Sequence, residues 1–238
     1  MKNLRKSFVI LLSAMLLAGC SSTRSENVTS TGNSGKATAD SKSKKSKEIT
    51  LDDLETKEYK VENEYATEYL VTVKNKSDQT IALNSNATAY DANNSMLGAA
   101  DGTIEVLGAG EQSVMYFYFD GAKNVDHVDY KTNMQYNTNP PYDPVISNLS
   151  VKDAVNGDNL TVAITNNGKE AAQFVEVYAV FCDANNTPLE IDDTYVADSN
   201  DEIAPGATQS ATISYYSEYD KGAFDHVDYY LTGRANKS

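Results

Sequence analysis

Two identical pentapeptides carry the chain's only histidines. The sequence Asp-His-Val-Asp-Tyr occupies residues 126–130 and returns at residues 225–229, with His127 and His226 in second place. Alternate side chains of a β-strand share a face, so His127 lies on the face of Asp129 while the valine and tyrosine share the other. An imidazole beside a carboxylate could bind a metal ion or act as an acid–base pair.

Neither pentapeptide is complete as a chemical site. A metal centre needs three or more ligands, and each copy offers one histidine with one or two aspartates. The chain contains no GxSxG, HExxH or phosphate-loop pattern. We therefore interpret each copy as a closing strand, with valine and tyrosine packed inward and aspartate and histidine in solvent. We predict no catalytic residue, metal or cofactor, and a hydrolase built on His127 or His226 remains the alternative.

A second repeated motif contains spaced oxygen side chains. Asp-Ala-Asn-Asn occurs at residues 91–94 and again at residues 183–186. Such oxygens could bind Ca²⁺, but neither copy supplies the glycine and glutamate positions of an EF-hand loop. Asp and Asn also stabilise hairpin turns by bonding to their own backbone. We expect turns, with calcium binding as the alternative.

The N-terminus has the pattern of an exported lipoprotein. Lys2, Arg5 and Lys6 precede an apolar run over residues 8–17, which is too short to span a membrane. The run ends in Leu-Ala-Gly-Cys at residues 17–20, which resembles the lipobox of bacterial lipoproteins. That resemblance implies cleavage before Cys20 and lipid on its thiol, as the only anchor to the extracellular face of the cell membrane.

The remaining cysteine leaves no intramolecular disulfide once Cys20 is acylated. Cys182 follows Phe181 within an apolar strand pattern, so we expect a buried, unreactive thiol.

Alternating sequence predicts β-structure after residue 50. Tyr65, Thr67, Tyr69, Val71 and Val73 occupy every second position, and the polar residues Glu64, Glu68, Thr72 and Lys74 stand among the positions between, which predicts a strand with one buried face. Helical patterning of a turn or two is confined to residues 51–57.

Several motifs occur twice in the same order, which predicts a duplicated unit. Residues 71–75 match residues 162–166, and Leu-Gly-Ala-Gly at 107–110 matches Ile-Ala-Pro-Gly at 203–206. Short strands with frequent turns predict a β-sandwich for each copy. The fold class is therefore all-β, with two tandem Ig-like sandwiches. The predicted parts are a signal peptide (1–19), a disordered Ser/Lys-rich tether (20–49), sandwich 1 (50–136), a linker (137–144) and sandwich 2 (145–238).

The order of turns and strands resembles the FxLYD-type Ig-like domains of bacterial surface lipoproteins. The resemblance covers residues 145–234 well and residues 60–133 more loosely. The family's Phe-x-Leu-Tyr-Asp pattern is reduced to Tyr90-Asp91 in the first copy and to Asp183 in the second. The resemblance implies two sandwiches and transfers no catalytic residues.

Net charge excludes one class of partner. The chain carries a formal charge of −14, which repels nucleic acid. The sequence therefore predicts a lipid-anchored, non-enzymatic binding or scaffolding protein whose partner is a cell-envelope protein or a glycan. An accessory subunit that presents a ligand, glycan or ion to a membrane partner is the alternative. The residues that bind a ligand are not identified by the sequence.

Overall fold

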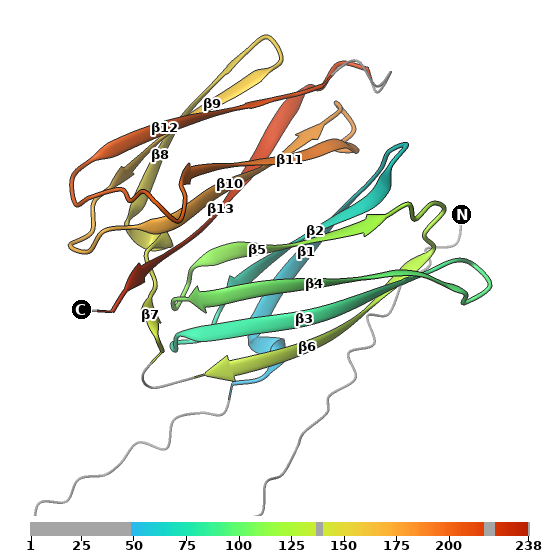
Figure 1. Cartoon of the computed structure of the whole chain (residues 1–238), viewed down its shortest axis with the longest axis horizontal. Helices are drawn as coiled ribbons and strands as arrows, with labels where there is room; N and C mark the ends of the chain where they lie inside the picture. Colours follow the sequence, from blue (N-terminus) through green and yellow to red (C-terminus); the bar gives the residue numbers. More distant parts are fainter. Residues whose placement is uncertain (1–48, 137–139, 217–221, 238) are drawn as a thin grey trace, which may run out of the picture. The chain divides into compact units, whose positions relative to one another are not determined.

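The computed structural model describes residues 49–136, 140–216 and 222–237. The predicted signal peptide, Cys20 and the tether up to residue 48 lie outside this part of the chain. The described residues form antiparallel β-strands that build two Ig-like sandwiches in succession, which confirms the predicted fold class (Figure 1). No helix in this part of the chain is long and apolar enough to cross a membrane.

Sandwich 1 contains two three-stranded sheets. The first sheet has the order β1-β2-β5 and the second the order β4-β3-β6. The strands are β1 (Leu54–Glu62), β2 (Ala66–Asn75), β3 (Ile81–Tyr90), β4 (Met96–Leu107), β5 (Gln112–Asp120) and β6 (His127–Tyr136). A single 3₁₀ turn (Leu51–Asp53) precedes β1, so the helical pattern at residues 51–57 was wrong beyond that turn.

Sandwich 2 repeats this strand order. One sheet has the order β8-β9-β12 and the other β11-β10-β13, to which the short strand β7 adds at the edge. The strands are β7 (Tyr142–Asp143), β8 (Leu149–Asn156), β9 (Asn159–Asn166), β10 (Gln173–Cys182), β11 (Pro188–Ala197), β12 (Thr208–Ser214) and β13 (His226–Asn236), with a 3₁₀ turn (Ile146–Asn148) before β8.

One repeated asparagine explains two of the repeated motifs. Asn75 is buried at the end of β2, and its Nδ2 donates to the carbonyl oxygens of Leu107 (3.2 Å) and Gly108 (3.0 Å). In sandwich 2 the Nδ2 of Asn166 donates to the carbonyl oxygen of Ile203 at 2.8 Å. Each asparagine thus links the end of its strand to the glycine turn that precedes the neighbouring strand of the same sheet, β5 or β12. Loss of such a buried hydrogen bond is costly.

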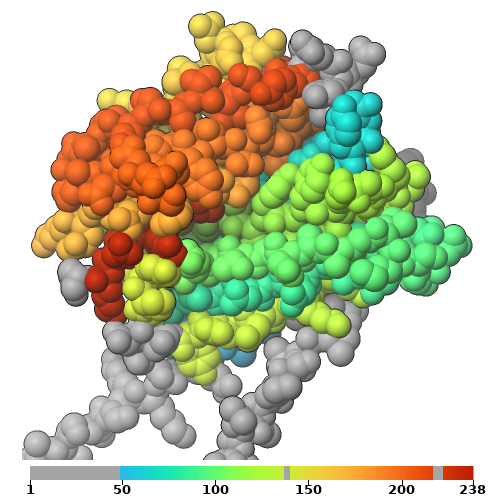
Figure 2. Space-filling model, viewed as in Figure 1, coloured from blue at the N-terminus to red at the C-terminus, as the bar shows by residue number. Residues whose placement is uncertain are grey.

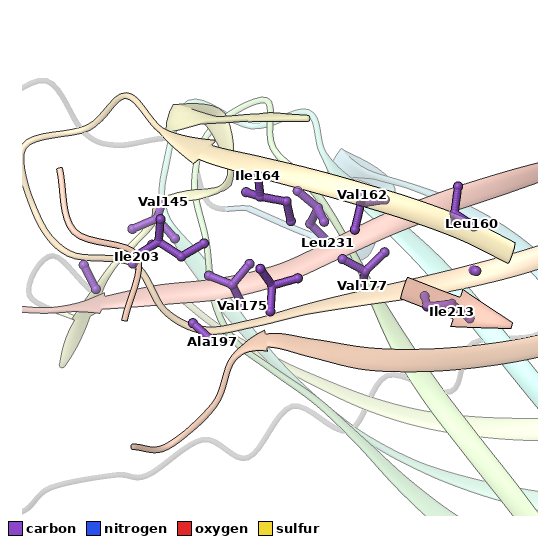
Figure 3. Packing of buried hydrophobic residues seen from close by; sticks show 14 of the residues in the cluster. Val145, Leu160, Val162, Ile164, Val175, Val177, Ala197, Ile203, Ile213 and Leu231 are labelled. Atoms are coloured by element: carbon purple, nitrogen blue, oxygen red, sulfur yellow. The ribbon is translucent and has the colours of Figure 1, made fainter. Parts of the chain in front are cut away.

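Each sandwich encloses its own apolar core. Val71, Val73 and Phe117 are among the buried residues of the first core. In sandwich 2, Val162 and Ile164 of β9 face Val175 and Val177 of β10 (Figure 3). Ile49, the last residue of the predicted tether, is buried in the first core. The first sandwich therefore begins one residue before the predicted start at residue 50.

A third apolar cluster joins the two sandwiches. Leu70 and Val114 on the outer face of β1-β2-β5 pack with Val180, Cys182 and Ile191 on the outer face of β11-β10-β13. The four sheets are therefore stacked, with these two in the middle (Figure 1). The prediction that β2 buries only one face was wrong.

The burial of β2 shows the error directly. Thr67, Tyr69, Val71 and Val73 are buried as predicted. The residues between them, Glu68, Leu70 and Thr72, are also buried, and only Lys74 of this strand is exposed. Tyr65, which the alternation placed inside, is 58% exposed.

Candidate functional site

The first Asp-His-Val-Asp-Tyr copy lies at the surface of sandwich 1. Val128 and Tyr130 pack against the first core, as predicted, while Asp129 is exposed. The His127 ring stacks on Tyr90 at 5.2 Å between centroids, and its Nδ1 lies 3.1 Å from the Asp126 carboxylate. The side chain is half-exposed and is held by these two contacts.

The second copy faces sandwich 1. Val227 and Tyr229 pack against the second core, so the inward half of the prediction holds again. The prediction that Asp228 lies in solvent was wrong. Its Oδ2 accepts hydrogen bonds from the Tyr59 hydroxyl (2.5 Å) and from Lys57 Nζ (3.4 Å). Identical pentapeptides thus have different surroundings.

The second copy also lies beside the buried thiol. Cys182 of β10 is paired directly with His226 of β13. Cys182, His226 and Asp228 each bring one donor atom into a group whose atoms all lie within 4.8 Å of one another. Cys182 is 1% exposed, which confirms the predicted burial, and burial raises the pKa of its thiol.

The two Asp-Ala-Asn-Asn motifs are hairpin turns. Asp91 Oδ1 accepts from the backbone N–H groups of Asn93 and Ser95, both at 2.8 Å. Asp183 Oδ1 does the same with Asn185 and Thr187, again at 2.8 Å. In each turn the backbone N–H of the residue four places on contributes most to lowering the pKa of the carboxyl. The carboxylates therefore stabilise the turns through the backbone, as the turn interpretation predicts.

A cleft between the two sandwiches is the strongest candidate for a ligand site. Its volume is about 390 Å³, within the range of small-molecule pockets. Figure 2 shows the sandwiches pressed together along the seam where β4 and β5 meet the second sandwich. Residues of β4, β5, β10, β11 and β13 line the cleft: Asp101 to Val106, Ser113, Val114, Tyr116, Phe174, Glu176, Tyr178, Tyr195, Thr232, Gly233 and Arg234.

One wall of the cleft is built around Arg234. Its guanidinium lies 3.8 Å from the ring centroid of Tyr142 and 4.2 Å from that of Phe174, and it forms an ion pair with Glu105. Phe174 has a φ of +50°, a left-handed conformation that is costly for an aromatic residue. It lies where the pairing of β10 with β13 shifts register. The fold therefore holds this side chain in a strained position against the arginine.

The opposite charge in the cleft centres on Glu176. This carboxyl is 8% exposed, and burial raises its pKa to about 7, helped by a hydrogen bond with Asp193. The Tyr178 hydroxyl bonds to the same carboxyl. Burial, followed by the charge of Glu176, raises the pKa of Tyr178, and burial likewise raises that of Tyr116, so both rings stay neutral. The cleft therefore presents neutral aromatic rings beside ionisable carboxyls.

None of these cleft residues was predicted from the sequence to form a site. The pentapeptide histidines, His127 and His226, do not line the cleft. Two signals were present in the sequence. Arg234 is the only arginine after residue 24, and the segment 175–182 is apolar at almost every position, which is typical of a strand buried on both faces.

Comparisons with known proteins give no family. No family model matches the chain, and no curated protein matches it. A transglutaminase from red sea bream is 12% identical, with 80% of this chain and 32% of that chain covered and a TM-score of 0.23. A β-glucuronidase from glycoside hydrolase family 2 is 13% identical, with 76% and 21% covered and a TM-score of 0.19. The chain spans about a third and a fifth of these proteins, and at such TM-scores neither likeness supports an argument.

Proposed function

We propose that this chain is a lipid-anchored, non-enzymatic binding protein of the bacterial cell envelope, and that the cleft binds a small ligand with a cationic group. The observation that carries the proposal is the composition of the cleft. Asp101, Glu105 and Glu176 line it together with three tyrosines, and Arg234 is the only basic residue among them.

The chemistry of the cleft fits an ammonium group. Carboxylates attract it directly, and aromatic rings attract it through their negative faces. Arg234 is already paired with Glu105. Asp101 and Glu176 therefore have no basic partner among the residues that line the cleft. Residues of both sandwiches line the site, which therefore depends on their packing.

The carboxyls of the cleft do not favour a hydrolase. Glycosidases hold two carboxyl groups about 5–9.5 Å apart, so that a sugar or a water molecule fits between them. Glu176 and Asp193 are instead hydrogen-bonded to each other, and Asp193 is not among the residues that line the cleft. A hydrolase that uses His127 or His226 has no support from this cleft, since neither histidine lines it. Presentation of a bound ligand to a membrane partner is compatible with the same cleft.

Calorimetric titration tests the proposed ligand class. We would titrate the full chain with choline, spermidine, glucose and glutamate. Choline or spermidine should bind, and Glu176→Gln should weaken binding about tenfold, the loss of one charge-assisted contact. Glu64→Gln, which removes the same charge from an exposed residue outside the cleft, is the matched control. Stronger binding of glucose, or equal binding by both variants, would contradict the proposal.

The pH dependence of binding sharpens the test. Because the pKa of Glu176 is about 7, the affinity for a cation should rise between pH 6 and 8 as the carboxyl ionises. Glu176→Gln should remove this rise while the chain stays folded. A pH-independent affinity for the cationic probe would place the binding site elsewhere.

The lipoprotein identity and the membrane location are proposed from Cys20 and the resemblance to FxLYD-type surface lipoproteins. Metabolic labelling with palmitate tests them. The unchanged chain should incorporate label and remain with the membrane, whereas Cys20→Ala should be released unlabelled. Membrane retention of the unlabelled variant would show a different anchor.

A further inference from the structure

We propose that Cys182, His226 and Asp228 form a three-ligand site for Zn²⁺, with water completing the coordination. The three residues lie outside the cleft, so this site is independent of the proposed ligand site. Cys182 is on β10, and His226 and Asp228 are on the neighbouring strand β13. All three share the sheet face that packs toward sandwich 1.

The arrangement of donors suits zinc. Their sulfur, nitrogen and oxygen atoms lie within 4.8 Å of one another, and ligand atoms of a tetrahedral zinc site are about 3.5 Å apart. Side-chain rotation toward a shared ion would bring the three donors closer together. Cys182 and His226 are directly paired across two central, well-packed strands, so the backbone already fixes their separation.

Neighbouring side chains can hold the ligands in place. The Nδ1 atom of His226 lies 3.3 Å from the Asp225 carboxylate, which leaves Nε2 for a metal while this contact is kept. The hydrogen bonds that Asp228 accepts from Tyr59 and Lys57 both go to Oδ2 and leave Oδ1 for the ion. Carboxylates behind ligating histidines and hydrogen bonds to ligating carboxylates are typical of protein metal sites.

Access and charge are compatible with an ion. The His226 side chain is 36% exposed, so a hydrated ion can approach from its side although Cys182 is buried. Lys57 is a cationic partner of Asp228, and its side chain is 61% exposed. Because lysine is long and flexible, its ammonium can move into solvent when an ion neutralises the aspartate.

The duplicated unit provides a comparison within the same chain. In sandwich 1 the corresponding strand pair is Tyr90 and His127, followed by Asp129. A tyrosine replaces the cysteine and covers the histidine ring at 5.2 Å. The first copy thus lacks the thiolate, the ligand that most strongly favours zinc over harder cations.

Cobalt spectroscopy tests the proposal. In a Cys20→Ser background Cys182 is the only thiol. We would titrate this reduced, metal-free chain with Co²⁺ and then displace the ion with Zn²⁺. The expected result is one equivalent of bound Co²⁺ with a thiolate-to-cobalt charge-transfer band that zinc removes. Absence of that band in the folded chain would overturn the proposal.

Matched variants assign the ligands. Cys182→Ser should abolish the band, and His226→Gln should weaken binding at least about tenfold. His127→Gln in the first copy should leave the affinity unchanged. Asp228→Asn removes the charge of a half-exposed ligand. It replaces Cys182→Ser as the test if circular dichroism shows that Cys182→Ser is misfolded. Equal weakening by the two histidine variants, or full binding by Asp228→Asn, would contradict this set of ligands.

Discussion

The outer faces of β3 and β10 occupy the same place in two copies of one sandwich, but they differ in chemistry and in surroundings. On β3 this face carries Asn84, Asn86 and Thr88, and both asparagines are exposed. On β10 the corresponding residues are Glu176, Tyr178 and Val180, and the face lies against the other sandwich. The inner faces of both strands are buried and mostly apolar, with Ser85 as the polar exception on β3. The inner face therefore determines the fold, while the outer face determines which sheet packs against a partner.

The largest expected effect comes from removing an apolar residue from the packed outer face of β2. Leu70→Ala leaves a cavity in the cluster between the sandwiches and should lower the free energy of unfolding by about 2–5 kcal/mol. The corresponding residue in sandwich 2 is the exposed Thr161, and Thr161→Ala should change stability by less than about 0.5 kcal/mol. Urea denaturation measures both. Equal costs would show that the comparison between the faces is wrong.

A smaller effect is expected at the cleft wall. Arg234→Gln removes the ion pair with Glu105 and the stacking on Tyr142 and Phe174, at a cost of about 1–2 kcal/mol. Glutamine is also the residue at the corresponding place in sandwich 1, where Gln135→Ala is a control expected to be almost neutral. Thermal denaturation of both variants tests this. An unchanged midpoint for Arg234→Gln would mean that the ion pair and the ring contacts of Arg234 do not stabilise the interface.

The third effect is visible only as a function of pH. Burial holds the pKa of Glu176 at about 7 in the folded chain against an ordinary value of 4.5. The folded chain binds more protons than the unfolded one between these values, so this residue lowers stability as pH rises from about 4.5 to 7. After allowance for solvent screening, the change is on the order of 1–2 kcal/mol.

Glu176→Gln should flatten that dependence and make β10 resemble β3, which has the neutral Asn84 at this position. Urea denaturation at pH 5 and pH 7.5 gives the difference between the two chains. A difference that grows toward acid would reverse the expected sign and show that the carboxylate, rather than the carboxylic acid, is the form stabilised by the fold.

The smallest effect should be the same in both copies. Asp91→Ala and Asp183→Ala each remove two turn hydrogen bonds in an exposed hairpin, and each should lower the melting temperature by a few degrees at most. Addition of calcium or of a chelator should leave both turns unaffected, because Oδ1 of each carboxylate already accepts two backbone N–H groups. A calcium-dependent melting temperature that disappears with either variant would restore the calcium hypothesis.

The sequence predicted the parts of the fold that depend on each copy alone. Alternation located the inner faces, such as Val71 and Val73, and the repeated motifs located both sandwiches. The outer residues Glu68 and Thr72 were assigned to solvent because nothing local distinguishes a polar residue that is exposed from one that another domain covers. The cleft and the Cys182 group were missed for the same reason, since their residues come together only through packing between strands or sandwiches that are distant in the sequence.

The way in which the two copies meet has a consequence for assembly. Each copy contributes a different sheet, so the contact is heterologous and does not close on itself; repeated between chains, it would grow into a filament. The two remaining faces are polar, which disfavours such growth. Sandwich 1 ends in exposed asparagines on β3, and sandwich 2 ends in hydroxyl pairs, Thr161 with Thr212 (3.1 Å) and Thr165 with Thr208 (2.7 Å). Polar terminal faces therefore disfavour continuation of the stack beyond the two domains of one chain.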